Sequence, residues 1–493
     1  MANQLKNQHL LWRAGFGPAV EQLEDLGKVS TKQFYKALVK ASDKKPEYIN
    51  VADNYLQGLM MGFDDVGRIQ QKELTPDEKK MVRDKNREGV KNLNLSWLKE
   101  MVNSPAQLRE KMAFFWHGHF ACRNLNVFYQ QCLLDVIRTN ALGNFGTMLR
   151  EVSKTAAMLN FLNNQQNKKD HPNENFAREV MELFTVGRGN YSETDIKEAA
   201  RAFTGWTATV RGDFIFRKGQ HDFGNKTVMG KSGNLEGEDV LNILLDQKQT
   251  AHNLAQKIYR FMVNDTPDKE RVDWLADRFY KSNYDIAGLL EDIFTSDWFY
   301  DQKNTGVRIK SPVELLVGIQ RMLPMKLQNQ ESLIVLQRIL GQLLFYPPNV
   351  AGWPGGKTWI DSSTLMMRMR IPQLINDEDE MNVTPKTDDD QMMGRPDEAA
   401  MADNRAKAVA KGKNISNKGM KPIDADIDWS KFLGYFEKTD RANLENAIAG
   451  LLLQTKTAVG GDIIKAYADG TSRESFIKSA TIQVMSTPEY QLC

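Results

Sequence analysis

A stripe of polar side chains within residues 171–187 has the residue types and spacing best suited to chemistry. If NENFAREVMELF forms a helix, four polar residues at i, i+3, i+4 and i+7 share one face: Asn175, Arg178, Glu179 and Glu182. Carboxylates one turn apart can hold an ion together or act as an acid–base pair. The alternative is an exposed ion pair with Arg178, worth only about 0.3–0.5 kcal/mol. We interpret Arg178, Glu179 and Glu182 as candidate catalytic residues and Asn175 as a candidate substrate-binding residue.

The pair His221-Asp222 places an imidazole and a carboxylate at a predicted turn, residues 222–225 of a hairpin expected over 213–230. A loop histidine beside an aspartate suits acid–base or metal chemistry, and an aspartate before Gly-Asn is also an ordinary turn residue. Both interpretations stay open. Arg201, on a helix predicted over 192–204 and capped by Ser192, is a candidate partner for these carboxylates and a candidate substrate-binding residue.

Two histidines end the helix predicted over 105–120. His119 falls on its apolar stripe, and His117 lies two positions away, so the two rings diverge by about 200° and cannot easily share one ion. We expect His119 to be a hydrogen-bonded core histidine and His117 to be exposed. Metal ligation by His119 is the alternative.

Three tryptophans lie in segments rich in glycine or proline. Trp353 and Trp359 belong to PPNVAGWPGGKTW, which lacks the spacing of a phosphate-binding loop, and Trp206 belongs to TGWT. Such residues can form an aromatic platform for a ligand, or they can fill the core. We keep all three as candidate substrate-binding residues.

The elements that must position these residues are mostly helical. Apolar residues recur at spacings of three and four along most of the chain, and alternating patterns are scarce, which predicts an all-α fold: an irregular multi-helix bundle with one small β-hairpin. Residues 376–427 turn acidic and poor in aromatics, which is typical of a disordered insertion. The predicted organisation is therefore a helical core over 1–375, the insertion over 376–427, and helices over 428–493 that complete the core.

Composition narrows the classes of partner. The 493 residues carry 65 Lys+Arg and 63 Asp+Glu, a net charge of +2, which gives no reason to expect a nucleic-acid partner. No segment reads as a membrane span or as the apolar part of a signal peptide. We expect a cytoplasmic protein as the chain is written, and a periplasmic or envelope protein if a signal peptide has been removed.

Six ordered motifs carry a resemblance to a known family: LLWRAGFGP (10–18), FFWHGHF (114–120), NENFAREVMELFTVG (173–187), YSETDIKEAARAFTGWT (191–207), HDFGNKTVMG (221–230) and PPNVAGWPGGKTW (347–359). Together they resemble the bacterial family named domain of unknown function eighteen-hundred. That resemblance spans nearly the whole chain. It implies a largely helical protein, often encoded beside a sulfatase- or phosphatase-like companion, which is a possible partner. It implies no specific reaction.

Two functional hypotheses follow from these residues. In the first, the protein is a metal-dependent enzyme, a hydrolase or an oxidoreductase, whose divalent transition metal is held by His119, Glu179, Glu182 and His221. Mixed histidine and carboxylate ligands suit Zn, Mn or Fe better than Ca or Mg. Asp222 then serves either as general base or as a hydrogen-bond partner of a metal ligand. In the second, the polar motifs form a structural core of a non-catalytic helical partner or assembly subunit that works with the companion protein.

Overall fold

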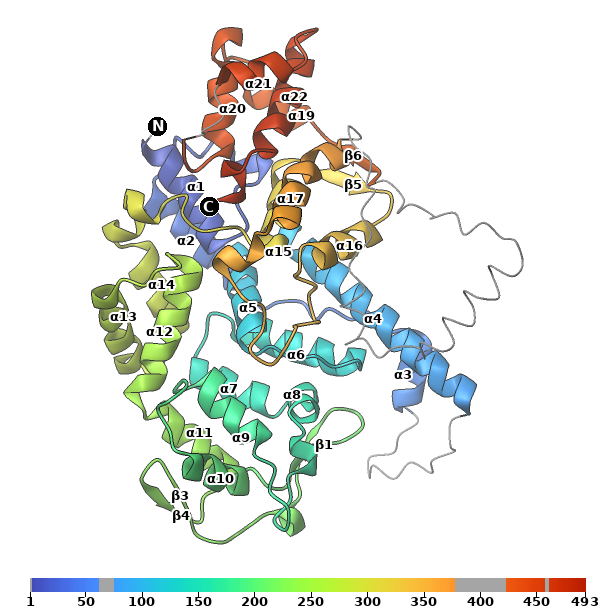
Figure 1. The fold of residues 1–493 in the computed structure, drawn as a ribbon, viewed down its shortest axis with the longest axis vertical. Coiled ribbons are helices and arrows are strands. Elements are labelled where there is room, and N and C mark those ends of the chain that lie inside the picture. Colours follow the sequence, from blue (N-terminus) through green and yellow to red (C-terminus); the bar gives the residue numbers. More distant parts are fainter. Residues whose placement is uncertain (1, 62–74, 377–422, 457–460) are drawn as a thin grey trace.

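The computed structural model describes residues 2–61, 75–376, 423–456 and 461–493. The described part of residues 2–161 forms eight α-helices: α1 (Ala2–Ala14), α2 (Thr31–Ser42), α3 (Asn54–Met61), α4 (Pro76–Asn103), α5 (Gln107–His119), α6 (Val127–Asn140), α7 (Phe145–Ser153) and α8 (Ala156–Phe161). Helix α5 lies in the middle of the molecule, between α4 and α6 (Figure 1). It confirms the helix predicted over 105–120.

The region of the polar stripe and the His-Asp pair forms the end of the molecule opposite the C-terminal helices (Figure 1). Its elements are α9 (Asn175–Glu179), a π-helical turn η3 (Val180–Phe184), α10 (Glu193–Ala202), β1 (Trp206–Ala208), β2 (Phe214–Phe216), β3 (Lys226–Val228), β4 (Lys231–Gly233) and α11 (Gly237–Leu245). Ser192 caps α10 through a reciprocal bond with Asp195, as predicted from the sequence.

The single hairpin predicted over 213–230 is replaced by two antiparallel ribbons. Strand β2 pairs with β1, which precedes it in the chain, and β3 pairs with β4, which follows it. The turn of the second ribbon lies at Met229-Gly230, where both residues have positive φ, 47° and 79°. That backbone suits a tight two-residue turn, so the chain reverses there and not at residues 222–225.

Helices α11, α12 (Lys248–Met262), α13 (Lys269–Lys281) and α14 (Ile286–Phe294) lie along one side of the molecule (Figure 1). The rest of the described chain forms α15 (Pro312–Met322), β5 (Met325–Leu327), α16 (Glu331–Ile339), α17 (Ser362–Ile375), β6 (Ala425–Ile427), α19 (Ser430–Tyr435), α20 (Leu444–Leu452), α21 (Gly461–Tyr467) and α22 (Arg473–Met485). The all-α class is confirmed.

The two ends of the chain meet in this fold. Gln8 on α1 donates to the backbone carbonyl of Leu451 at 2.7 Å, and α1 lies beside the C-terminal helices (Figure 1). The predicted insertion over 376–427 lies outside the described residues except at its ends, where β6 pairs antiparallel with β5. Among the described residues, no helix is long and apolar enough to cross a bilayer.

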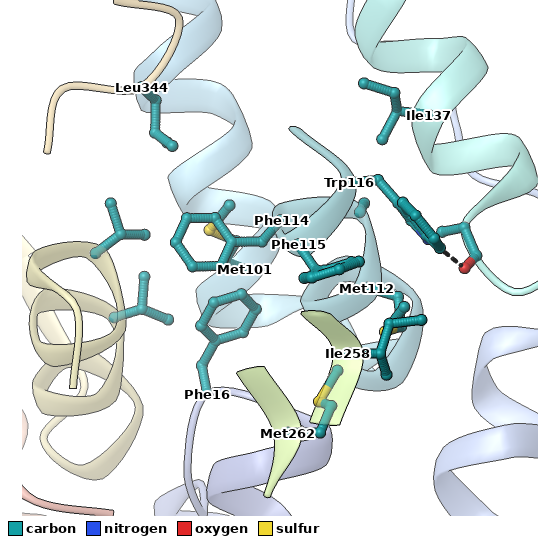
Figure 2. Packing of buried hydrophobic residues seen from close by; sticks show 14 of the residues in the cluster. Phe16, Met101, Met112, Phe114, Phe115, Trp116, Ile137, Ile258, Met262 and Leu344 are labelled. Carbon is teal, nitrogen blue, oxygen red and sulfur yellow. Dashed lines mark hydrogen bonds between the residues drawn. The ribbon is translucent and has the colours of Figure 1, made fainter. Parts of the chain in front are cut away.

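Buried aromatic and aliphatic side chains surround α5. Phe115 and Trp116 pack against residues of α6 and α12, including Ile137, Ile258 and Met262 (Figure 2). The Trp116 indole nitrogen donates to the carbonyl of Ala141 at 3.0 Å, so its one polar atom is satisfied within the core.

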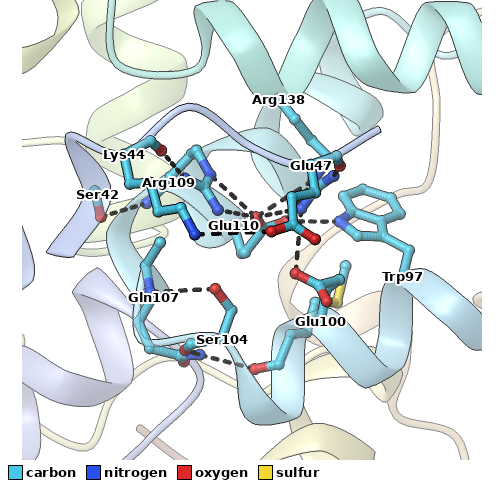
Figure 3. A network of polar contacts seen from close by, with 12 residues as sticks. Ser42, Lys44, Glu47, Trp97, Glu100, Ser104, Gln107, Arg109, Glu110 and Arg138 are labelled. Carbon is cyan, nitrogen blue, oxygen red and sulfur yellow. Dashed lines mark hydrogen bonds and ion pairs between the residues drawn. The ribbon is translucent and has the colours of Figure 1, made fainter. Parts of the chain in front are cut away.

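Helix α5 also buries charge, which must be paired. The carboxylate of Glu110 accepts bonds from the guanidinium groups of Arg109 and Arg138, with closest distances of 3.0 and 2.9 Å, and from the indole of Trp97 at 3.0 Å (Figure 3). Glu110 is fully buried, and Glu100 forms a more exposed arm of the same network. This network fixes α5 against α4 and α6.

Candidate functional site

The strongest candidate site is a pocket of about 610 Å³ beside the C-terminal half of α5. Helix α12 and the loop over residues 347–359 supply most of its other walls. A larger hollow of about 990 Å³ lies between α2, α4 and α15, but it contains none of the residues singled out in the sequence and no buried polar side-chain atom without a hydrogen bond. The smaller pocket contains both, so we treat it as the candidate site.

The walls of the pocket are aromatic. Phe115 of α5 and Phe261 of α12 lie with their ring centroids 5.2 Å apart, and Trp353 and Trp359 of the 347–359 loop line the same pocket. Two of the tryptophans predicted to bind substrate therefore come together at one pocket. Flat apolar walls of this kind favour a ligand with a planar or apolar body.

Backbone geometry holds the 347–359 loop against α5. Gly352 has φ of +82°, and a Cβ at that position would come within 2.5 Å of the carbonyl oxygen of Gly118. Only glycine allows this approach without strain. The His117 ring lies 5.5 Å from the Trp353 ring and accepts a bond from the Phe345 amide at 3.2 Å.

Replacing Gly352 by alanine is expected to displace the loop and lower the free energy of unfolding by about 1–3 kcal/mol, since the new methyl adds a clash to an unfavourable φ. Chemical denaturation measures the change. Gly355→Ala is the matched control, because a Cβ there meets no atom within 4 Å. Equal effects from both variants would contradict the tight approach.

Positive charge gathers around the aromatic walls. Lys257 and Arg260 extend from α12, and Lys357 from the loop. None of these three cations forms an ion pair with a described residue. Asp265 is the carboxylate that lines the same pocket, so the lining favours an anion when Lys257 is protonated.

A fourth cation of the lining, Arg308, is buried and neutralised by an ion pair. Its guanidinium forms a bidentate pair with the buried carboxylate of Glu314, with a closest distance of 2.6 Å, and Lys111 bonds the same carboxylate. Burial alone would raise the pKa of Glu314, but the charges of Arg308 and Lys111 lower it to about 2. The carboxylate is therefore ionised and locks α15 to α5.

Lys257 contacts the segment that follows α9. Its side chain is half-buried, and its amine donates to the carbonyl of Leu183 at 2.6 Å. Burial lowers the pKa of Lys257 to about 8. Leu183 belongs to the π-helical turn η3, and the last carbonyls of a helix have no partner within it, so this oxygen is available to the lysine.

His119 lies in the aromatic wall of the same pocket. Burial and the charge of Lys257 hold the pKa of His119 well below its usual value. The backbone of Phe184 opposes this shift weakly, but it does not form a hydrogen bond with the ring. The expected hydrogen bonds are therefore wrong: both ring nitrogens of His119 are buried without a partner among the described residues. The expected exposure of His117 is also wrong, since it is buried.

The polar stripe of α9 forms surface ion pairs. Arg178 contacts Glu174 at 3.1 Å and Glu193 at 2.8 Å. Glu182 accepts a bond from the Tyr191 hydroxyl and pairs with the exposed Arg188 at 3.3 Å. These contacts agree with the ion-pair alternative.

The remaining members of the stripe differ from this pattern. Glu179 is half-buried, and its pKa is raised by burial and by the charge of Glu182. The Asn175 amide bonds the Leu162 carbonyl at 3.2 Å, which ties α9 to the end of α8. Neither side chain lines the candidate pocket.

The His-Asp pair lies in a separate network. His221 places Nδ1 2.9 Å from the Thr204 carbonyl, and Asp222 accepts a bond from Arg201 at 2.7 Å. Arg201 also bonds Glu198, whose carboxylate accepts the Thr227 amide. The network attaches β3 to α10.

Trp206 fills the core beside this network. It is buried, and its ring contacts Phe203 and Phe214. A Cβ added to Gly237 would lie 2.4 Å from the indole. The core alternative therefore describes Trp206, which does not line the pocket.

The four predicted metal ligands do not assemble. His119 lines the pocket, Glu179 ends α9, Glu182 lies in η3, and His221 contacts Thr204. Across the ranges that the structure describes, no group of three or more His, Cys, Asp or Glu residues has the arrangement of a metal site.

The cations of the pocket were not predicted from the sequence. Lys257 and Arg260 are one turn apart in TAHNLAQKIYRFMV, which shows only an amphipathic helix. Lys357 follows Gly-Gly in a loop that was singled out for its tryptophans. Nothing in the sequence pattern indicates that this loop and α12 line one pocket, since that depends on how both pack against α5.

One protein family matches nearly the whole chain. The model of the family described as "Protein of unknown function (DUF1800)" matches residues 9–492. No curated protein and no solved structure is detectably similar to the chain. The match includes α5, α12 and the 347–359 loop, so every wall of the candidate pocket lies within the family region. The chain belongs to the DUF1800 family.

Proposed function

We propose that the protein binds a small organic anion with a planar or apolar body in the pocket between α5, α12 and the 347–359 loop. The observation that carries the proposal is the combination, in one pocket, of aromatic walls with three cations that have no ion-pair partner among the described residues. An aromatic carboxylate is the simplest molecule of this class.

Each part of the pocket has a physical role in such binding. Phe115, Phe261 and Trp353 remove the ligand's apolar surface from water, at about 25 cal/mol per Å². Arg260 and Lys357 supply charge at the exposed side, where an arriving anion meets them first.

A buried polar atom without a partner gives independent support. Buried nitrogens are normally hydrogen-bonded, and the ring nitrogens of His119 have no hydrogen-bond partner in the described part of the chain. A ligand group that reaches the wall of the pocket can supply the missing bond.

The proposal is tested by calorimetric titration of the full chain with benzoate. Arg260→Gln and Lys357→Gln are each expected to weaken binding about tenfold, roughly the effect of one charge-assisted contact. Lys79→Gln on α4 is the matched control, because Lys79 is exposed and outside the pocket. Binding should also weaken with salt, since the Debye length falls from about 30 Å at 0.01 M to about 8 Å at 0.15 M. Absence of saturable binding, or equal weakening by the control, would contradict the proposal.

The finer functions predicted from the sequence stay predictions. They are a metal-dependent hydrolase or oxidoreductase, and a non-catalytic partner of a sulfatase- or phosphatase-like companion. The cytoplasmic or envelope location also stays a prediction. The pocket is compatible with either role, because anion binding serves a substrate as well as a regulatory ligand.

A further inference from the structure

We propose that Lys257 is a catalytic residue that forms an imine with the carbonyl group of an anionic aldehyde or ketone held in the pocket. This inference rests on the proposed function and specifies its substrate class. It adds a covalent reaction to the non-covalent binding proposed for the pocket.

The surroundings of Lys257 favour a free amine. Lys257 lines the pocket, and its Nζ makes one hydrogen bond among the described residues, to the neutral carbonyl oxygen of Leu183 at 2.6 Å. No described carboxylate pairs with it. A carboxylate partner would stabilise the ammonium form, and here that stabilisation is missing.

The charge state agrees with this geometry. With a pKa lowered to about 8 by burial, roughly one-tenth of the Lys257 amine is neutral at pH 7, on the order of 100-fold more than for an ordinary lysine. A lysine whose pKa is lowered by desolvation can act as a nucleophile toward a carbonyl group. Arg260 follows one turn later and lines the same pocket.

The covalent step balances without any co-reactant. The nitrogen lone pair of neutral Lys257 attacks the carbonyl carbon and forms the C–N bond. The carbonyl oxygen takes up both amine protons and leaves as water, so that a C=N bond replaces the C=O bond. The ligand's anionic group stays among Arg260 and Lys357, which orients the carbonyl toward the amine.

Lys310 is an internal comparison within the same chain. Burial lowers its pKa to about 7, below that of Lys257. Its amine is fully buried, bonds the Tyr490 carbonyl at 2.5 Å and lies over the Trp12 ring, outside the pocket. If access to the pocket decides reactivity, Lys257 reacts and Lys310 does not.

The test uses 4-formylbenzoate with cyanoborohydride on the full chain, followed by peptide mass mapping of the reduced adduct. We expect Lys257 to be labelled at least about tenfold faster than exposed lysines, in line with its larger neutral fraction. Lys310 should stay unlabelled, and excess benzoate, which has no aldehyde, should protect Lys257. Lys257→Arg, which keeps the charge but has no amine that can form an imine, should remove the main adduct.

The wild-type protection experiment decides the question even if the Lys257→Arg variant fails to fold. Label spread over exposed lysines without enrichment at Lys257, in protein that binds benzoate, would overturn the imine and leave the anion pocket standing. Failure to bind benzoate would instead overturn the proposed function itself.

Discussion

Replacing Glu110 by alanine is expected to lower the free energy of unfolding by about 3–5 kcal/mol, because the buried Arg109 then loses its carboxylate partner and the buried Arg138 keeps only the partly exposed Glu100. Arg109 and Arg138 both depend on this carboxylate, and Arg138 is almost completely buried (Figure 3). The Trp97 indole would lose its acceptor as well. Denaturant unfolding measures the change.

The control for this prediction is Glu100→Ala. Glu100 contacts the same Arg138 at 3.3 Å, but its side chain is 43% exposed, so we expect a loss of about 1 kcal/mol or less. If the two variants lose equal stability, the buried network does not hold α5 as described.

Glu314→Gln is the second change with a large expected effect, about 3–5 kcal/mol, since it leaves Arg308 and Lys111 buried without their shared carboxylate. The wild-type pair also makes stability depend on pH. The folded pKa of Glu314 is lowered to about 2, below its ordinary value near 4.5. Its contribution is therefore complete above about pH 4.5 and is lost as the pH falls toward 2, a total of about 3 kcal/mol.

The check is denaturant unfolding of wild type and Glu314→Gln between pH 6 and the acid range. The difference between them should narrow as the pH falls, because the variant has no carboxylate left to protonate at that position. Glu331→Gln, which removes a surface partner of Lys91, should run parallel to wild type. A constant difference for Glu314→Gln across the acid range would show that this carboxylate does not control the pH dependence.

Local signals in the sequence predicted the elements well. The periodicity of residues 105–120 predicted α5, and the Ser192 cap predicted the start of α10, because each depends on residues close together in the chain. Turn placement was harder. The reversal at Met229-Gly230 depends on how β3 attaches to α10 through Glu198, which the turn residues alone do not reveal.

The site was predicted only in part, for a related reason. Trp353, Trp359 and His119 were singled out and do line one pocket. Glu182 and Asp222 were singled out by the same argument, yet they bond nearby residues of their own region. In the sequence, a motif residue that lines the pocket looks the same as a motif residue that bonds only its own region. The two kinds are distinguished by the tertiary contact between α12 and the 347–359 loop, which brings together residues about 100 positions apart.

The most direct test of the anion pocket is a crystal structure of the protein soaked with 4-bromobenzoate, in which anomalous scattering locates the bromine. We expect one dominant bromine position between Phe115, Phe261 and Trp353, with the carboxylate directed toward Arg260 or Lys357. A bromine found only outside this pocket, or no ordered bromine in crystals that leave the pocket open to solvent, would contradict the account.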